Sequence, residues 1–283
     1  MMFTTEQLIK LALAEDLGSG DMTTLTTVPA GSTATATLTF KENAVVAGLE
    51  MMALVYRTLD ASLKIDFLVC EGDPVDRGTD VARVTGCSAS LLMGERVALN
   101  FFQHLSGIAT LTRQYVDRIA EFHAAVVDTR KTTPGWRTLE KYAVQVGGGK
   151  NHRMGLFDGI MIKDNHIKAA GSITKAVQQA RRLAPHTLRV EVEVENLEQL
   201  EEACRAGAEI ILLDNMAVEL MQQAVDSTRQ SYPGVLLEAS GGITLDTIAP
   251  VAATGVDFIS VGALTHSARA IDISMNIVSC DHG

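Results

Sequence analysis

The sequence predicts an α/β protein in which an incomplete barrel, or an open doubly wound sheet, accompanies a separate N-terminal domain. Short apolar segments alternate with helical segments after about residue 123, which is typical of βα units with a parallel sheet. Six clear strand segments, with room for a seventh, fall within residues 106–265. A complete eight-stranded barrel usually needs ~250 residues, so an incomplete one is expected. The first hundred residues or so mix strand and helix patterns without this alternation.

The N-terminal region reads as a helix followed by strands. Thr4 and Gln7 match a capping box, which predicts that a helix begins there. Residues 33–48 alternate small and apolar side chains, as strands do. Residues 63–86 contain two strands joined by turn residues. The 63–86 segment carries no convergent reactive groups, and we interpret it as scaffold.

A buried helix, or two, is predicted between Ser88 and Thr112, where the only formal charges are Glu95 and Arg96. Adjacent residues do not face each other on a helix, so these two charges need separate partners. On this stretch alone, two buried salt bridges are the simpler interpretation. The alternative is that Arg96 points into a ligand site across a subunit interface.

Composition excludes several classes of protein. The chain has 283 residues and a formal net charge of −10 at pH 7, which argues against a nucleic acid as partner. No run of ~18 uncharged apolar residues predicts a membrane span, and the first residues do not resemble a signal peptide. The four cysteines lie far apart and lack zinc-site spacing. We therefore expect reduced thiols in a cytoplasmic protein.

Charged residues or glycines follow nearly every strand of the second region, and the carboxyl ends of parallel strands form the functional edge of such folds. In chain order, the candidate residues at these ends are Thr129, Arg130, Lys131, Lys163, Glu193, Asp214, Ser240, Gly241, Gly242 and Gly262, and the segment between the first two strands supplies His152 and Arg153. Each signal alone is weak. A lysine ending a strand is usually a solvated rim residue, and Glu191, Glu193 and Glu195 share one side of their strand, as a solvent face would. Together, however, these residues favour a functional site.

The candidate residues also sort by chemistry along the chain. Cations come first, carboxylates follow, and glycines come last. Glycines after the last strands of a barrel suit a phosphate group, because bare backbone N–H groups can approach its oxygens. Cations opposite them suit carboxylates or pyrophosphate. Carboxylates between the two suit sugar hydroxyls, a divalent metal or a developing carbocation. The pattern therefore predicts a phosphorylated sugar that meets a multiply charged anion.

The second region contains the segments "TRKTTPGWR", "EKYAVQVGGGKNHRMGLFDGIMIKDNH", "EVEVE", "LLDN", "EASGGI" and "SVGALTHS", and "EDLGSGDMTT" and "GERVALNFFQHLSGIAT" lie nearer the N-terminus. Together these segments resemble the nicotinate-nucleotide pyrophosphorylase (carboxylating) family, also called quinolinate phosphoribosyltransferase. The resemblance extends nearly from end to end, and "TRKTTPG" with "KDNH" is its specific part. Trp136 stands where the resemblance leads us to expect Leu or Phe.

The resemblance implies an N-terminal α/β sandwich domain and an open α/β barrel of about seven strands. We expect the first to be residues 1–105, with residues 267–283 returning to it, and the second to be residues 106–266. The implied activity is that of a pentosyltransferase in de novo NAD biosynthesis. It converts quinolinate and phosphoribosyl pyrophosphate to nicotinate mononucleotide, pyrophosphate and CO2, with Mg²⁺. A homodimer is also implied.

The resemblance further assigns roles to individual residues. Positions around the two quinolinate carboxylates match Arg130, His152, Arg153 and Lys163. A position that reaches in from the neighbouring subunit matches Arg96. Positions near the pyrophosphate match Lys131 and Lys163, and positions at the ribose hydroxyls and Mg²⁺ match Glu193 and Asp214. We expect Lys131, Glu193 and Asp214 to be catalytic. The 5-phosphate cradle matches Ser240, Gly241, Gly242 and Gly262, and we expect the substrate-binding set to include Thr129 and Ala263.

Four other functions remain open at this stage. A molybdenum-transport-associated, ModD-like protein shares the scaffold but is expected to lack an intact "KDNH". A nicotinate-preferring phosphoribosyltransferase differs by one substrate carboxylate. An aldolase with Lys163 as its Schiff-base lysine needs fewer cations. A barrel that binds a phosphorylated metabolite without catalysis needs no complete carboxylate pair. The cationic set and the carboxylate pair favour the quinolinate reaction.

Overall fold

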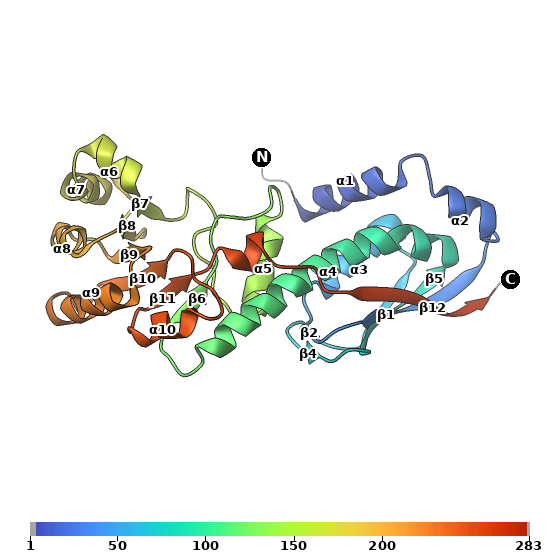
Figure 1. The fold of residues 1–283 in the computed structure, drawn as a ribbon. Coiled ribbons are helices and arrows are strands. Elements are labelled where there is room, and N and C mark those ends of the chain that lie inside the picture. The colour runs from blue at the N-terminus through green and yellow to red at the C-terminus, as the bar shows by residue number, and fades with distance from the viewer. Residues whose placement is uncertain (1–3, 282–283) are drawn as a thin grey trace. The chain divides into compact units, whose positions relative to one another are not determined.

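The computed structural model describes residues 4–281 (Figure 1). The chain divides into two compact units. The first consists of the chain up to residue 111, residues 133–147 and the chain from residue 268 onward. The second consists of residues 112–132 and 148–267. The expected domains, 1–105 with 267–283 and 106–266, differ from these units chiefly in assigning residues 133–147 to the barrel.

The first unit is built on a four-stranded antiparallel sheet with the strand order β12-β1-β5-β3. Its strands are β1 (Thr33–Phe40), β3 (Lys64–Phe67), β5 (Asp80–Cys87) and β12 (Ile273–Asp281). A small two-stranded sheet pairs β2 (Ala44–Val45) with β4 (Pro74–Val75). The pairing of β12 with β1 brings a C-terminal strand back to this sheet (Figure 1).

The first unit also contains helices. They are α1 (Thr5–Leu17), α2 (Met22–Thr27), α3 (Leu49–Leu59), α5 (Arg137–Val146) and the first turns of α4 (Ser88–Arg118). Phe102 of α4 meets Phe40 of β1 edge to face, and the Tyr56 hydroxyl of α3 contacts Met275 of β12. The Thr4–Gln7 capping box that begins α1 is confirmed. Residues 88–118 form one continuous helix rather than two.

The second unit is built on a six-stranded parallel sheet with the strand order β6-β11-β10-β9-β8-β7. Its strands are β6 (Ala125–Val127), β7 (Ile160–Ile162), β8 (Val190–Val194), β9 (Ile210–Asp214), β10 (Leu236–Ser240) and β11 (Phe258–Ser260). Lys150 adds an isolated parallel bridge beside Val127 of β6. Because β6 and β7 do not pair, the barrel is open. The predicted fold class is confirmed, with six full strands and a single bridge in place of a seventh.

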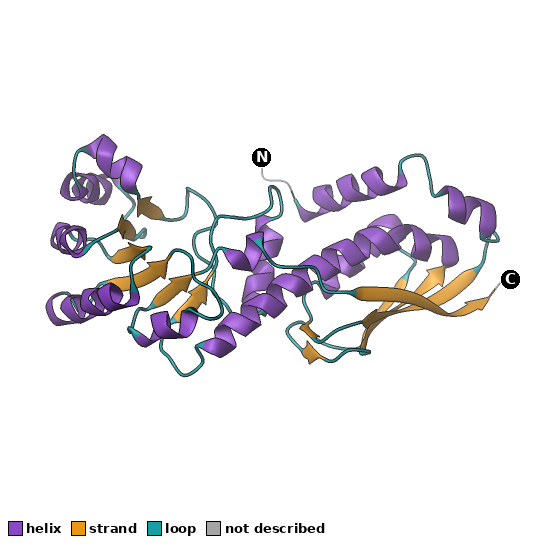
Figure 2. Ribbon diagram, viewed as in Figure 1, coloured by secondary structure: helices purple, strands orange, loops and turns teal. Residues whose placement is uncertain are grey.

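The helices of the second unit follow one another along the sheet (Figure 2). They are α6 (Asp164–Ala170), α7 (Ile173–Leu183), α8 (Leu197–Ala206), α9 (Val218–Ser231), α10 (Ile248–Ala253) and α11 (Ala263–His266). Polar caps begin two of them, because Ser172 accepts the Lys175 N–H and Asn196 accepts the Gln199 N–H. Each of these two caps fixes where its helix begins. A loop therefore connects the helix to the element before it.

Candidate active site

The strand register brings the carboxyl ends of four strands to one level. Ser240 of β10 pairs with Asp214 of β9 on one side and with Ser260 of β11 on the other. Ser260 in turn pairs with Val127 of β6. The residues that follow these strands therefore emerge at the same edge, as expected for a parallel sheet.

A cavity of about 680 Å³ lies at this edge. The cavity is lined by nearly all the candidate residues: Thr129, Arg130, Lys131, His152, Arg153, Lys163, Glu193, Asp214, Ser240, Gly241, Gly242, Gly262 and Ala263. These residues come from every strand end of the parallel sheet, although they are distant in sequence. The structure thus brings together cations, carboxylates and glycines in a single hollow of the second unit.

The loop after β6 is held against the loop after β11. The Thr265 hydroxyl donates to the Lys131 carbonyl at 2.7 Å, and the Lys131 N–H donates to the Thr129 hydroxyl at 3.1 Å. A Cβ added to Gly262 would lie 3.3 Å from Cδ of Lys131. The absence of a side chain at Gly262 therefore leaves room for the Lys131 side chain beside it.

The glycine turn after β10 depends on its glycines. Gly241 has φ +104° and Gly242 has φ +60°, and the left-handed region strains other residues. A Cβ added to Gly241 would fall 2.1 Å from Oδ1 of Asn215. Asn215 itself has φ +51° and donates from Nδ2 to Asp214 at 2.9 Å. This close approach of β9 and β10 loops leaves bare backbone facing the cavity, which suits a phosphate group.

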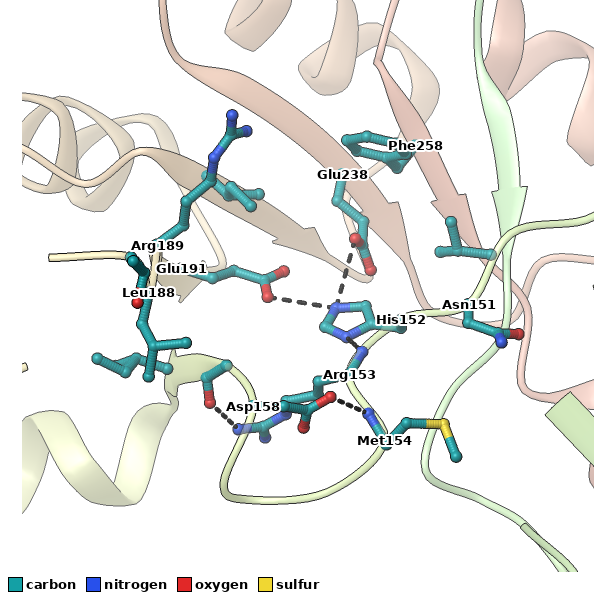
Figure 3. A pocket seen from close by; sticks show the side chains of 15 residues that line it. Asn151, His152, Arg153, Met154, Asp158, Leu188, Arg189, Glu191, Glu238 and Phe258 are labelled. Carbon is teal, nitrogen blue, oxygen red and sulfur yellow. Dashed lines mark hydrogen bonds and ion pairs between the residues drawn. The ribbon is translucent and has the colours of Figure 1, made fainter. Parts of the chain in front are cut away.

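The cations of the cavity are held in different ways. Lys163 is the N-cap residue before α6 and forms an ion pair with Glu193 of the neighbouring strand. Arg153 donates from Nη1 to the Gly159 carbonyl at 3.1 Å (Figure 3). Burial, and then the charge of nearby Arg130, lowers the pKa of Arg153. Arg130 and Arg153 therefore place two positive charges close together in the cavity. An anion with more than one negative charge would relieve their repulsion and could bind both.

Glu193 and Asp214 supply two carboxylates to the same cavity. Carboxylate oxygens are ligands that Mg²⁺ takes, and Mg²⁺ commonly uses only one or two protein carboxylates, with substrate oxygens and water completing its octahedron. The pair therefore fits a Mg²⁺ ion that is held partly through a substrate. Lys163 already contacts Oε2 of Glu193, so fewer carboxylate oxygens are left for the ion.

The His152 ring points toward two carboxylates of the barrel strands (Figure 3). The backbone N–H of His152 donates to Asp128 at 2.8 Å, and Asp128 is fully buried. Its Nε2 lies 3.2 Å from Glu191 and 3.6 Å from Glu238. Although His152 lines the cavity, its Nε2 faces carboxylates rather than open space. Its predicted contact with a quinolinate carboxylate stays a prediction.

Glu238 is a site residue that the sequence did not single out. It lines the cavity from β10, yet only 3% of its surface is exposed. Burial, and then the charge of Glu191, raises the pKa of Glu238 to about 7. The available signal was a carboxylate inside the apolar segment "VLLEAS". Other cavity residues outside the candidate set include Asn215, Thr244, Ser260 and His266.

Arg96 does not line this cavity. It lies exposed on α4 of the first unit, and neither it nor Glu95 takes part in an ion pair among the described residues. The interpretation of Glu95 and Arg96 as two buried salt bridges is therefore wrong. The predicted contribution of Arg96 from a neighbouring subunit stays a prediction.

Trp136, the residue that departs from the expected Leu or Phe, is accommodated within the first unit. Its ring stacks on Phe101 with centroids 4.5 Å apart and meets the His104 ring edge to face. The departure is therefore a matter of packing beside α4. It changes no residue of the cavity.

Two family profiles match the chain. "Quinolinate phosphoribosyl transferase, N-terminal domain" matches residues 21–106, and "Quinolinate phosphoribosyl transferase, C-terminal domain" matches residues 108–276. A probable nicotinate-nucleotide pyrophosphorylase (carboxylating) of Synechocystis sp. is 51% identical over 94% of this chain and 90% of its own length. A Bacillus subtilis protein with the same name is 43% identical over 96% of this chain and 93% of its own length.

Solved structures agree with these matches. NadC from Streptococcus pyogenes superposes with a TM-score of 0.93 at 43% identity, over 99% of this chain and 98% of its own. The nicotinate-nucleotide pyrophosphorylase from Francisella tularensis superposes with a TM-score of 0.92 at 41% identity, over 96% and 95% of the two chains. Fold, site and sequence thus lead to one assignment. This chain belongs to the quinolinate phosphoribosyltransferase family.

Proposed function

We propose that this protein is a quinolinate phosphoribosyltransferase, a pentosyltransferase of NAD biosynthesis. It joins quinolinate to the ribose of phosphoribosyl pyrophosphate and releases pyrophosphate and CO2. The observation that carries the proposal is the single cavity in which a cation cluster, a carboxylate pair and a glycine turn meet. Membership of the family named above supports the same reaction.

The cation wall binds quinolinate. Arg130, Arg153 and Lys163 line one cavity, and a guanidinium group can hold a carboxylate through two parallel hydrogen bonds. Two ring carboxylates need more positive charge than one. This arrangement orients the diacid so that its ring nitrogen faces the sugar.

The glycine turns bind the sugar phosphate. The backbone after β10 and β11 receives the 5-phosphate, since Gly241, Gly242 and Gly262 line the cavity without side chains. Lys131, beside Gly262, lies where it can neutralise the leaving pyrophosphate. Each such charge contact contributes roughly 2–4 kcal/mol to lowering the barrier.

The chemistry proceeds in two stages. The bond from the anomeric carbon to pyrophosphate breaks with its electron pair, and Glu193 and Asp214 stabilise the cation-like ribose. The quinolinate nitrogen then forms the new bond with its lone pair and becomes a pyridinium. In the second stage the bond from C2 to its carboxylate breaks, CO2 leaves, and the pyridinium stabilises the electron pair left on carbon. A proton then takes that pair.

We also propose Mg²⁺ as the cofactor, held by Glu193 and Asp214 together with substrate oxygens. When bound, it supplies positive charge to the pyrophosphate and ribose oxygens. The donor set of the cavity, two carboxylates at neighbouring strand ends, supports this proposal.

We further propose a homodimer in the cytoplasm, with Arg96 entering the neighbouring subunit's cavity. The exposed position of Arg96 on α4 supports a role outside its own chain. Exposed apolar side chains on the first two helices, Leu11, Met22 and Leu25, support an interface there. Among the described residues, no helix is long and apolar enough to cross a membrane.

One assay separates this function from its alternatives. Pyrophosphate release is measured with phosphoribosyl pyrophosphate and either quinolinate or nicotinate. A quinolinate phosphoribosyltransferase releases pyrophosphate with quinolinate and much less with nicotinate. Greater pyrophosphate release with nicotinate than with quinolinate would support a nicotinate-preferring phosphoribosyltransferase. Release with neither acid would support a ModD-like protein or a metabolite-binding barrel, and borohydride trapping of a carbonyl substrate on Lys163 would support an aldolase.

A further inference from the structure

The proposed reaction requires a proton donor that the cation wall does not identify. When CO2 leaves, the electron pair on C2 of the pyridinium ring must take a proton. The donor must lie in the substrate cavity, carry a proton near neutral pH and regain it after each turnover. This inference rests on the proposed function and names one residue of the same site.

A trio of titratable side chains lies where the substrate cavity meets a second hollow. It consists of His152, Glu191 and Glu238, whose ligand atoms all lie within 4.8 Å of one another. Figure 3 shows the His152 ring between the two carboxylates. Oε1 of Glu191 and Oε1 of Glu238 have no hydrogen-bond partner in the part of the chain that the structure describes. Two buried, half-satisfied carboxyl groups beside a histidine are costly and call for an explanation.

The hydrogen bonds of the imidazole fix its proton. Nδ1 of His152 accepts the backbone N–H of Arg153 at 2.7 Å, so Nδ1 carries no proton. The ring proton of the neutral imidazole is therefore on Nε2 and points toward Glu191 and Glu238. A metal ion on Nε2 would displace this proton and leave both ring nitrogens without one. The trio is consequently a proton-holding cluster rather than a metal site.

The surroundings of Glu238 oppose its ionisation, because a like charge close by in a buried site disfavours a second one. Glu238 is the more deeply buried, and its charged form is opposed first by burial and then by Glu191. The groups that favour its charged form are His152, the Ser260 hydroxyl and Lys163. The balance keeps a proton on Glu238 up to neutral pH.

A second cavity provides a route for a new proton. Its volume is about 570 Å³, and strand-start residues such as Ile160, Ile210 and Phe258 line it. His152, Arg153 and Glu238 line this cavity and the substrate cavity alike. His152 and Glu238 therefore stand between the substrate cavity and a separate hollow at the amino ends of the strands, which Glu191 also lines.

We propose that Glu238 donates the proton that replaces the departing carboxylate, and that it is recharged from the second cavity beside His152 and Glu191. The bond from C2 to the carboxylate breaks, CO2 leaves, and the electron pair on C2 takes the proton from the Glu238 carboxyl. Glu238 becomes a carboxylate, and water in the second cavity returns one proton. The overall reaction then consumes one proton for each CO2 released.

The first test separates ribosyl transfer from product formation. Glu238→Gln keeps the shape and neutrality of the protonated acid but cannot give up a proton to carbon. In single-turnover experiments, pyrophosphate release should stay within about threefold of wild type, whereas formation of nicotinate mononucleotide should fall at least about 100-fold. The dicarboxylated mononucleotide should accumulate. Glu195→Gln, which alters an exposed glutamate beyond the end of β8, should change neither rate.

Three outcomes would overturn the proposal. Product formation at the wild-type rate would place the donor elsewhere, with Lys163 or water as the source. An equal fall in pyrophosphate and product would mean that Glu238 only positions other groups. If wild-type protein releases no pyrophosphate, the proposed function itself is wrong. That result differs from one in which wild type is active and only the role of Glu238 fails.

A second measurement remains decisive if Glu238→Gln fails to fold. Wild-type protein is run in H2O and D2O across pH 6–9, a range that brackets the Glu238 pKa of about 7, with both products followed. The proposal expects product formation, but not pyrophosphate release, to slow in D2O and to decline above pH 7 as Glu238 loses its proton. Glu238→Asp, which restores an acid with a shorter arm, should recover part of the product rate. A product rate that is independent of pH and solvent isotope would contradict the proposal.

Discussion

Nε2 of His152 lies 3.2 Å from a carboxylate oxygen of Glu191, inside a barrel whose mouth carries Arg130, Arg153 and Lys163. Cations thus line the cavity near the strand ends, while a histidine and two glutamate side chains meet further inside the barrel. The cations suit binding of the diacid, and the inner acid group suits delivery of the proton that loss of a carboxylate requires.

Replacing Arg130 with alanine should weaken binding of quinolinate. Loss of a charge-assisted, two-pronged contact is expected to raise the apparent KM for quinolinate by on the order of 10–100-fold. Arg130→Lys should recover only part of this, because one ammonium group cannot fork to two oxygens. Initial rates at saturating phosphoribosyl pyrophosphate measure the effect. Arg182→Ala, at an exposed position on α7, serves as the control, and an unchanged KM in Arg130→Ala would remove Arg130 from the binding site.

Replacing Gly241 with alanine should disturb the phosphate turn. The new Cβ would meet Asn215 Oδ1 at 2.1 Å in a residue with φ +104°, so the turn must shift. We expect a loss of roughly 1–3 kcal/mol of unfolding free energy and a higher KM for phosphoribosyl pyrophosphate. Thermal melts and initial rates measure the two effects. Gly234→Ala has open space around its Cβ and should change neither quantity; equal behaviour of the two variants would disprove the role of the turn.

The placement of Arg96 can be tested by mixing inactive chains. If Arg96 serves the neighbouring subunit, Arg96→Ala and Glu193→Ala chains should complement each other. Random pairing in a two-fold dimer leaves about a quarter of the sites intact. Mixtures of Glu193→Ala chains with Asp214→Ala chains should recover no activity, because every barrel in the mixture then carries one of the two changes. No recovery in verified mixed dimers of the first pair would mean that each site is built within one chain.

The pKa of Glu238 also predicts how stability depends on pH. A free glutamate titrates near 4.5, but burial and Glu191 raise the pKa of Glu238 to about 7. Between these values the folded state binds a proton that the unfolded state has lost, so stability falls as pH rises through this window. The loss is on the order of 3 kcal/mol when Glu238 acts alone.

Glu238→Gln should remove that part of the decline. Denaturant unfolding at pH 5 and pH 8 measures it, with Glu195→Gln as the control on an exposed carboxyl. The variant should lose less stability than wild type between the two pH values. An identical decline in variant and wild type would show that the Glu238 carboxyl is not held protonated by the fold.

The sequence predicted most of the fold and nearly all of the cavity for a physical reason. Strand and helix alternation located the parallel sheet, and the carboxyl ends of its strands then had to converge. Arg130, Asp214 and Gly241 could be found in this way because each lies at or shortly after the carboxyl end of a strand. The number of strands was less certain, since the seventh is only the bridge between Lys150 and Val127.

Residues inside the barrel could not be predicted in the same way. Glu238 lies in the middle of β10, where strand periodicity shows only that it faces one side of the sheet. Its meeting with His152 depends on curvature of the sheet and on a loop that enters it. The buried salt bridges expected for Glu95 and Arg96 failed for a related reason, because helix apolarity does not reveal which turn of α4 is exposed.

The central claim is that this one cavity couples ribosyl transfer to loss of a carboxylate. Quinolinate labelled at its 2-carboxylate measures this directly, when labelled CO2 and pyrophosphate are counted in the same reaction. The account predicts one labelled CO2 for each pyrophosphate, only when phosphoribosyl pyrophosphate is present, and loss of both in Glu193→Ala. Pyrophosphate release without labelled CO2, or labelled CO2 without phosphoribosyl pyrophosphate, would contradict it.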